Sequence, residues 1–415
     1  MPACASRCSS RAIAWAGCGC TTPKVEADPL GQQGSRIHTS LYASLKTNLP
    51  RDIMAFDDYT FDSAGGGADD WPRFPDHTCV LTYLERFAAH FALLPHIHFN
   101  AQVTSVAPTA DAWRLNVTHE GKESQLSFDA VAVCSGHFSD PRVPSLAGAA
   151  AFPGRQIHSH NYREPSGFRD RRVAVFGTSA SGLDLSREIG GVAQSVHWCG
   201  EMFNELPPAH RQDGALSRWP SIERLTGDGE IVTRGGLTAA VDDVVYCTGY
   251  HYRYPFMDAA LLTIDDNWVQ PLYHDLVHID RPTLGFIGIP FRVLPFAVFE
   301  TQARWFTALL GGAFRLPSPD AMRARTASYI AALRTRGVKQ RHFHQRTIDC
   351  FDYLDSLCDE AGIDRAPQWR RQTAAALLDA IERSRGNARG ILLPHFAPTV
   401  VPPESIAGAP APADR

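Results

Sequence analysis

The sequence has no long hydrophobic run and no excess of charge of one sign. Its 415 residues carry 40 Lys and Arg against 44 Asp and Glu, a formal net charge of −4. This balance argues against a protein that binds nucleic acid or an anionic membrane through net charge. Apolar runs such as residues 91–94 and 239–241 fall far short of the ~18 residues that cross a bilayer. We therefore expect no membrane-spanning segment.

The ten cysteines form no CxxC pair and show no spacing typical of a disulfide framework. The six from Cys79 onward are scattered through expected strands and helices, which is typical of reduced, buried thiols in an intracellular protein. Cys18 and Cys20 have no downstream Cys or His at ligand spacing, so we expect no metal site. The first 25 residues are basic and lack acids, which leaves a targeting peptide open, although its apolar stretch is short.

The hydrophobic pattern predicts an α/β protein of two or three domains. Apolar residues recur at helical spacing from Val80 to Leu94 and again over 300–310 and 320–385. Short β-rich runs lie between these helices, at 96–99, 102–106, 113–118 and 125–128. Residues 129–134 and 243–247 are continuous apolar runs that stop at Ser135-Gly136 and Thr248-Gly249. Such runs are typical of buried parallel strands whose carboxyl ends meet a ligand, so we expect two parallel sheets.

A glycine-rich turn follows the strand expected at 172–176. The segment has Gly177, Ser179 and Gly182 at the spacing of a G-x-G-x-x-G fingerprint, with a strand before it and a helix over 179–189 after it. Gly177 suits the tight turn, and Gly182 lets the helix approach the strand. Ser179, in place of the middle glycine, takes some room but adds a hydroxyl donor. The N-terminus of the helix then favours a pyrophosphate, although a plain strand–turn–helix without ligand has the same pattern.

The dinucleotide itself is not settled by the sequence. An acid about 20 residues after the first glycine favours NAD, whereas a nearby arginine favours NADP. The next strand ends in His197-Trp198-Cys199-Gly200-Glu201, with no arginine at its tip and with Glu201 slightly late. Arg211 is a further candidate if its loop folds back.

The segment before this turn resembles a family signature. Phe152, Gly154, His158 and Tyr162 stand at the spacing F-x-G-x-x-x-H-x-x-x-Y of the flavin-containing monooxygenases. Baeyer–Villiger enzymes have a similar motif that usually ends in Trp, so Tyr162 fits the first family better. Further blocks resemble the family in order: residues 42–50, 135–137, 141–144, 246–250 and 290–305.

The resemblance implies two Rossmann-like domains, of which the FAD domain is discontinuous. It predicts a non-family, disordered leader over 1–34, FAD-domain residues over 35–150, an NADP-binding domain over 151–249, an FAD-domain return with C-terminal helices over 250–395, and a disordered tail over 396–415. The family opens with a first G-x-G-x-x-G unit for FAD, and residues 1–34 do not supply it. We therefore expect the FAD domain to lack its first βαβ unit, which would leave the sheet short and its neighbours exposed.

The resemblance implies a monooxygenase that uses NADPH, FAD and O₂ to oxygenate a soft nitrogen or sulfur of a small molecule, as N,N-dimethylaniline monooxygenases do. Asn48 would donate a hydrogen bond beside the flavin as the catalytic residue, although an Asn before Leu-Pro can also simply cap a loop. His158 is more typical of a structural histidine than of an acid or base. The implied cofactor-binding residues are Gly177, Thr178, Ser179, Ala180, Ser181, Gly182, Thr248, Gly249, Gln302 and Arg304.

Other interpretations remain beside this one. Thr248 and Gly249 are also compatible with an ordinary β-turn, and Glu300 with Arg304 forms an i,i+4 surface ion pair in any exposed helix. If flavin binding is lost, the chain is a non-catalytic NADP-binding protein. A disulfide reductase is disfavoured because it needs a redox-active cysteine pair. The absence of a hydrophobic C-terminal anchor favours a cytoplasmic location. The oligomeric state stays open.

Overall fold

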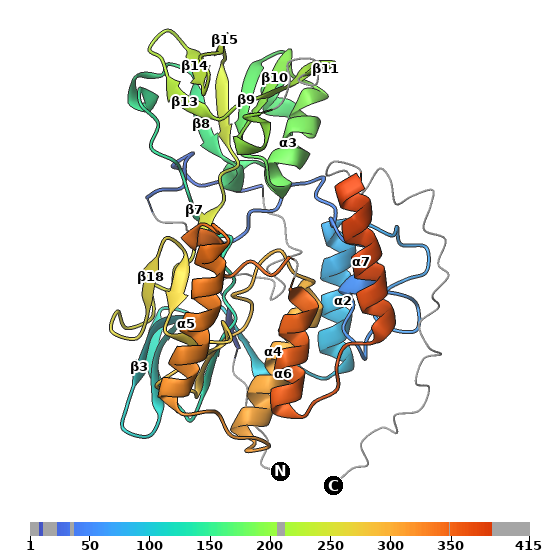
Figure 1. Ribbon diagram of the computed structural model, residues 1–415, viewed down its shortest axis with the longest axis vertical. Helices are drawn as coiled ribbons and strands as arrows, with labels where there is room; N and C mark the ends of the chain where they lie inside the picture. The colour runs from blue at the N-terminus through green and yellow to red at the C-terminus, as the bar shows by residue number, and fades with distance from the viewer. Residues whose placement is uncertain (1–7, 11–22, 34–36, 206–211, 348, 384–415) are drawn as a thin grey trace. The chain divides into compact units, whose positions relative to one another are not determined.

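The computed structural model describes residues 8–10, 23–33, 37–205, 212–347 and 349–383. The chain divides into two compact units (Figure 1). Unit 1 comprises Met1–Ser9, Lys46–Ser135 and Phe256–Arg415, and unit 2 comprises Ser10–Leu45 and Gly136–Pro255. Each unit contains parallel strands and helices, as the α/β prediction requires. Unit 1 is discontinuous, and the chain changes units at 135 and 255, where the sequence placed its boundaries at 150 and 249.

Unit 2 is built on a six-stranded sheet in the order β11-β12-β10-β9-β16-β8. Its strands are β8 (Arg155–His158), β9 (Arg172–Phe176), β10 (Ser195–Cys199), β11 (Gln212–Asp213), β12 (Leu216–Trp219) and β16 (Asp243–Tyr246). All neighbours are parallel except the edge strand β11. Helix α3 (Ala180–Gly190) packs on this sheet (Figure 1), with its Leu185 and Ile189 buried against Val175. Because β10 lies on one side of β9 and β16 on the other, the strand order reverses beside β9.

Two smaller features complete unit 2. The antiparallel strands β13 (Ile222–Leu225), β14 (Glu230–Thr233) and β15 (Thr238–Ala240) form a separate sheet, and β7 (Asp140–Pro141) pairs with β17 (Tyr250–His251). Residues 23–33 are held by a side chain of the signature segment: Asn161 accepts from the Glu26 N–H at 2.9 Å and donates to Pro29 O at 2.8 Å. A disordered leader is therefore wrong for residues 23–33; the tail over 396–415 lies outside the described residues.

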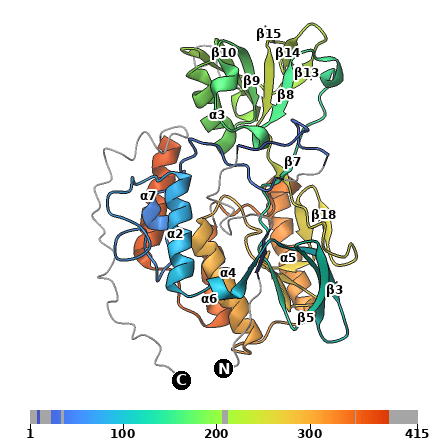
Figure 2. The ribbon, with the colours of Figure 1, turned by 180° about the vertical axis from the view of Figure 1, so that it is seen from behind.

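Unit 1 contains the sheet β20-β21-β22-β6, in which β22 (Leu284–Phe286) runs parallel to β6 (Val131–Val133). Strands β3, β4 and β5 form an antiparallel sheet of their own (Figure 2). The remaining strand pairs are β1 with β2 and β18 with β19. The bounds are β1 (Cys8–Ser10), β2 (Ile97–Phe99), β3 (Ala101–Pro108), β4 (Trp113–His119), β5 (Lys122–Phe128), β18 (Thr263–Asp265), β19 (Trp268–Gln270), β20 (Leu272–Tyr273) and β21 (Val277–His278).

The helices of unit 1 differ in length from the sequence prediction. They are α1 (Arg51–Met54), α2 (His77–His90), α4 (Pro295–Leu310), α5 (Pro319–Thr335), α6 (Cys350–Ala361) and α7 (Gln368–Arg383). Helix α2 stops before Leu94 because Ala92 adopts a positive φ of 50°. The stretch 320–385 is three helices, and α6 ends at Gly362 in the left-handed conformation. Short 3₁₀ helices occur at Leu94–His96, Ala149–Ala151, Ser159–Asn161, Ser166–Phe168, Glu201–Phe203 and Gln340–His342.

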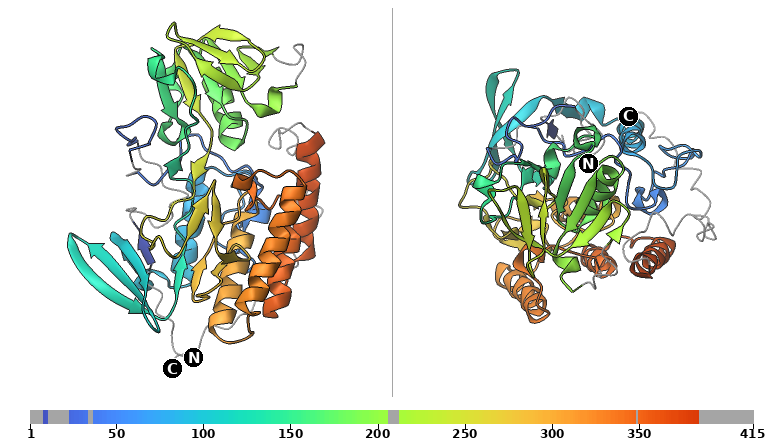
Figure 3. Two further views of the ribbon diagram at one scale, coloured as in Figure 1. Left: turned by 60° about the vertical axis from the view of Figure 1, so that its left-hand side comes forward. Right: turned by 90° about the horizontal axis from the view of Figure 1, so that it is seen from above.

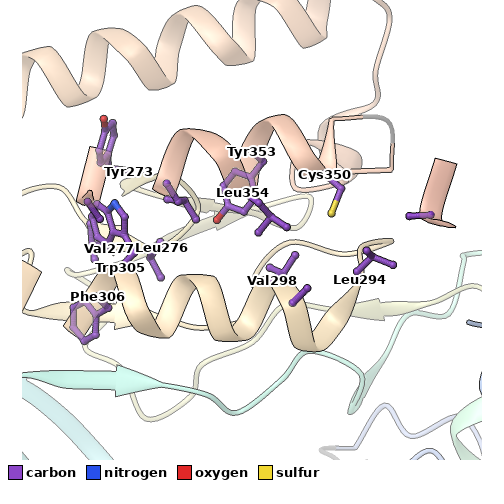
Figure 4. Packing of buried hydrophobic residues seen from close by; sticks show 14 of the residues in the cluster. Tyr273, Leu276, Val277, Leu294, Val298, Trp305, Phe306, Cys350, Tyr353 and Leu354 are labelled. Atoms are coloured by element: carbon purple, nitrogen blue, oxygen red, sulfur yellow. The ribbon is translucent and has the colours of Figure 1, made fainter. Parts of the chain in front are cut away.

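Helices α4 and α6 lie side by side and enclose the main core of unit 1 (Figure 3). Val298 and Trp305 of α4 and Leu354 of α6 are fully buried and point into this core (Figure 4). Among the described helices, none is long and apolar enough to span a membrane.

Candidate dinucleotide-binding site

The turn between β9 and α3 requires glycine at two positions. Gly177 has a φ of +129°. A Cβ at this position would lie 2.1 Å from the carbonyl oxygen of Cys247, the residue that follows β16. A Cβ on Gly182 would lie 1.8 Å from the Gly177 carbonyl oxygen. Both distances are far below van der Waals contact. There is therefore no room for a side chain between the turn and the Cys247 backbone, or between α3 and the turn. The prediction that these glycines permit a tight turn and a close helix approach agrees with this geometry.

Neighbouring strands fix the turn on both sides. The Gly177 N–H donates to Cys199 O at 2.9 Å, and the Cys247 N–H donates to Phe176 O at 2.7 Å. The indole N–H of Trp198 donates to Gly177 O at 2.8 Å. Sequence reasoning missed this role of Trp198; the signal was a large aromatic one residue before the end of the strand next to the glycine turn.

The start of α3 is open to solvent beside this turn. Ser179 and Ala180 are exposed, and the Ser179 side chain makes no capping hydrogen bond to the helix. The first N–H groups of a helix have no partner within the helix and carry its positive dipole end. The structure thus brings Gly177, Thr178, Ser179, Ala180, Ser181 and Gly182 together as the sequence predicted. A pyrophosphate fits here for two reasons. The glycines leave no side chain between the ligand and the backbone, and the start of α3 is open to it. Arg211, the further candidate from the sequence, lies outside the described residues.

Thr248 and Gly249 follow β16 at the same edge of the sheet. The Thr248 hydroxyl donates to Arg142 O, and the Arg142 N–H donates to Gly249 O at 2.9 Å. Gly249 has a φ of +88°. These bonds join the ends of β7 and β16, so both residues have a structural role in unit 2, and a cofactor contact by them stays a prediction.

The histidines at the end of β8 are buried. His158 is 0% exposed, its Nδ1 accepts from the His160 N–H at 3.1 Å, and burial lowers the pKa of His158 to about 3. Its imidazole is therefore neutral near pH 7. His160 is also buried and shares a 2.7 Å hydrogen bond with the Ser40 hydroxyl. This arrangement favours the structural interpretation of His158 over an acid–base role.

Asn48 lies in unit 1 on a loop that is tied down on both sides. Lys46 forms an antiparallel bridge with Asp76, the Thr47 N–H donates to Pro75 O at 2.9 Å, and the Arg51 N–H donates to Arg73 O at 2.8 Å. The Asn48 side chain itself is exposed. A firmly held loop with an exposed amide is suited to present a hydrogen-bond donor to a ligand.

Gln302 and Arg304 on α4 have partners inside the protein. Gln302 is 0% exposed; its Oε1 accepts from the Gly288 N–H at 2.9 Å and its Nε2 donates to the Tyr353 hydroxyl at 2.7 Å. We therefore assign Gln302 to holding the turn after β22, because a fully buried amide with both ends bonded is poorly placed to meet a cofactor. Arg304 lies 3.9 Å from carboxylates of Glu300 and Asp57, so the i,i+4 pair predicted as the alternative is present.

A cluster of charged and polar side chains in unit 1, formed by Asp275, His344 and Arg346, was not predicted from the sequence. Asp275 accepts from His344 Nδ1 at 2.9 Å and from Arg346 Nη2 at 2.8 Å. Burial alone would raise the pKa of Asp275, but the two partners more than offset it and hold that pKa below its ordinary value. His344 Nε2 accepts from the Val269 N–H of β19, so the group ties both β19 and the β20–β21 turn, which holds Asp275, to residues 344–346. Nothing in the local sequence pattern marks residues so far apart as partners.

Strand β6 of unit 1 lies at the edge of its sheet, with a neighbouring strand on one side only in the part of the chain that the structure describes. β6 pairs with β22, and among the described strands no other strand flanks it. Ala132 and Cys134 at this edge are exposed, whereas Cys199, Cys247, Cys350 and Cys358 are buried and free. The prediction that the six thiols from Cys79 onward are buried is thus confirmed for these four. Cys79 is only half-buried, and the prediction is wrong for Cys134. The described residues of unit 1 contain no turn like that at Gly177, so they show no matching cradle for the pyrophosphate of FAD.

Comparisons with known proteins show the family to which this chain belongs. A family model for flavin-binding monooxygenase-like proteins matches residues 31–201 and 199–369. The chain belongs to the flavin-containing monooxygenase family. It is 36% identical over 367 residues to flavin-containing monooxygenase FMO GS-OX-like 3 of Arabidopsis thaliana, covering 86% of this chain and 81% of that protein. It is 39% identical over 360 residues to FMO GS-OX5 of the same plant, covering 85% and 78%.

Among solved structures, the S-allyl-L-cysteine S-oxygenase of Allium sativum is similar with a TM-score of 0.86 and 35% identity, over 92% of this chain and 88% of that one. Cyclohexanone monooxygenase bound to NADP⁺ shares the fold at 15% identity. The family uses FAD and NADP, and this flavin-containing monooxygenase is a flavoprotein oxidoreductase by membership.

Proposed function

We propose that this flavin-containing monooxygenase uses NADPH and O₂ to oxygenate a soft nucleophile of a small molecule, with a thioether sulfur preferred. One oxygen atom of O₂ enters the substrate, the other leaves as water, and NADPH supplies the two electrons. The glycine turn of unit 2 carries the proposal, because its two obligatory glycines and the open start of α3 fit a dinucleotide. The similar Allium sativum protein is an S-allyl-L-cysteine S-oxygenase, which supports sulfur over nitrogen.

The residues of this chain have separate roles in the proposal. The backbone N–H groups at 179–182 bind the pyrophosphate of NADP, and Thr178 packs beside Gly200 to keep the turn closed, since a Cβ at Gly200 would lie 2.5 Å from Thr178 Cγ2. Asn48 donates its side-chain amide to the group on which negative charge develops during oxygen transfer. Such donors act best when the surrounding structure holds them in place, as the bonds of Thr47 and Arg51 do here.

A second candidate is a protein that binds NADP without oxygenating anything. The open side of β6 and the lack of a second glycine turn among the described residues of unit 1 favour this alternative.

The purified chain distinguishes the two functions. We expect flavin absorbance near 450 nm after incubation with FAD, and NADPH consumption that depends on an added thioether and yields its sulfoxide by mass spectrometry. A protein that stays colourless with FAD yet binds NADP⁺ would overturn the monooxygenase proposal in favour of the alternative. Dimethylaniline in place of the thioether tests nitrogen as the target atom.

A further inference from the structure

Residues 60–70 of unit 1 form a loop that folds back tightly on its own chain. A Cβ at Gly67 would lie 1.7 Å from Phe61 O, far below van der Waals contact. The Ser63 N–H and hydroxyl donate to the two carboxylate oxygens of Asp69, at 3.0 and 2.7 Å, and close the loop on itself. Compact loops of this length pack as small bodies of their own. We therefore expect the 60–70 loop to move as a whole or not at all.

Two arginine side chains hold this loop by its backbone. Arg51 donates to the carbonyl oxygens of residues 68 and 69, at 2.5 and 3.1 Å, and to that of residue 61 at 3.4 Å. Arg86 donates to the carbonyl oxygens of residues 66 and 67, at 3.2 and 2.9 Å. A guanidinium has five N–H donors in one plane, so one arginine can hold several carbonyl groups at once. The same loop is thus fixed from two separate positions in the chain.

The two arginines differ in what else they are attached to. Arg86 is a residue of α2, whereas Arg51 begins α1 directly after the segment that carries Asn48. Leu49 and Pro50 alone separate Asn48 from Arg51. The proline ring fixes its own φ, here −61°, and restricts the residue before it. Because this connection is stiff, a displacement of Arg51 is passed on to Asn48, and a displacement of Arg86 is not.

We propose that Arg51 is a positioning residue for Asn48: its side chain fastens the Asn48 segment to the 60–70 loop and so holds the amide in place. The inference rests on the proposed function, because it assumes that the Asn48 amide donates to the group on which charge develops. A donor of this kind is effective only when its position is fixed before the reaction, and a shift of ~1 Å is enough to lose most of its effect.

The yield of oxygen transfer tests this role. When transfer fails, NADPH, H⁺ and O₂ give NADP⁺ and H₂O₂, so sulfoxide and H₂O₂ are both measured per NADPH consumed. We expect Arg51→Ala to lower the sulfoxide yield about 10-fold, with H₂O₂ in its place and NADP⁺ affinity unchanged. Arg51→Lys keeps the charge and some of the donors, so its yield should fall between. Arg86→Ala is the matched control, since it loosens the same loop and should keep the wild-type yield.

A double-mutant cycle asks whether Arg51 acts through Asn48. In an Asn48→Ala background the amide is already gone, so Arg51→Ala should lower the sulfoxide yield no further.

Hydrogen exchange of the purified full chain gives a readout that needs no turnover. Both Arg51→Ala and Arg86→Ala should speed amide exchange in the 60–70 loop. Arg51→Ala alone should also speed it about 10-fold at residues 47 and 51, whose N–H groups bond to Pro75 O and Arg73 O on either side of Asn48. Arg51→Lys replaces Arg51→Ala in each comparison if the alanine variant does not fold.

Three results would overturn the inference and leave the proposed function intact. They are an unchanged sulfoxide yield in folded Arg51→Ala, equal losses in Arg51→Ala and Arg86→Ala, and a further loss when Arg51→Ala is added to Asn48→Ala. If the wild type forms no sulfoxide with FAD and NADPH, the proposed function fails and the inference fails with it.

Discussion

Substituting Gly177 by alanine should abolish tight dinucleotide binding. The new Cβ would lie 2.1 Å from Cys247 O, and ordinary contact begins at 3.4 Å, so the turn or the neighbouring chain must move by more than an ångström. A non-glycine residue at this φ also costs about 1–3 kcal/mol in backbone strain. Since a displacement of ~1 Å is enough to reduce a precisely placed interaction about 100-fold, we expect the dissociation constant for NADP⁺ to rise by about two orders of magnitude.

Two companion variants separate binding from stability. Gly190→Ala in the same helix is the matched glycine control: its Cβ would meet only Val196 Cγ2, at 4.0 Å, so both stability and binding should be preserved. Ser179→Asp adds a negative charge at the exposed start of α3, where an acid stabilises a helix but repels a pyrophosphate. We expect Ser179→Asp to keep the melting temperature and to weaken NADP⁺ binding. Ser179→Asn, which adds no charge, should leave both unchanged. Unchanged NADP⁺ affinity in folded Gly177→Ala and in Ser179→Asp would refute the assignment of the pyrophosphate to this turn.

Three further predictions concern other residues. Asn48→Ala should keep the melting temperature and NADP⁺ affinity, because Asn48 is exposed, but lower the sulfoxide formed per NADPH consumed; equal yields would remove Asn48 from the chemistry. Asp275→Asn should lower the free energy of unfolding by about 2 kcal/mol, since it removes one of the two carboxylates that bond to the buried Arg346, the other being Asp349. Because the pKa of Asp275 is lowered on folding, its stabilisation is present above the ordinary value of 3.8 and is lost as the pH falls below it. Urea unfolding between pH 5 and 3 should therefore show a shallower loss in the variant than in the wild type, and parallel curves would contradict this. Iodoacetamide should label exposed Cys134 in the native protein but not buried Cys247, whose pKa burial raises to about 12; peptide mapping that finds both labelled equally fast would contradict the described edge of β6.

The glycine turn could be predicted from the sequence because its determinants are local. A β-rich run, two glycines five residues apart and an amphipathic helix follow one another within 20 residues. Together they predict a strand, a tight turn and a helix from neighbouring residues alone. The parallel strands were predicted for the same reason, since continuous apolar runs such as residues 243–247 fit a strand buried on both faces.

The parts that could not be predicted depend on contacts between distant residues. Gln302 was expected beside a cofactor because the helix resembles a cofactor-side helix, but its amide is used by Gly288 and Tyr353. The end of α2 at His90 was missed because a positive φ at Ala92 is not visible in an apolar run.

The contacts of residues 23–33 have a consequence for how unit 2 is assembled during synthesis. Glu26 and Asn161 are bonded although 135 positions separate them, and Arg163 donates to Lys24 O across a similar span. Residues 46–135, which belong to unit 1, leave the ribosome between the two halves of each bond. Unit 2 therefore cannot close until much of the other unit's first stretch has emerged, so shortened chains that stop before Asn161 should leave the early segment open to proteases.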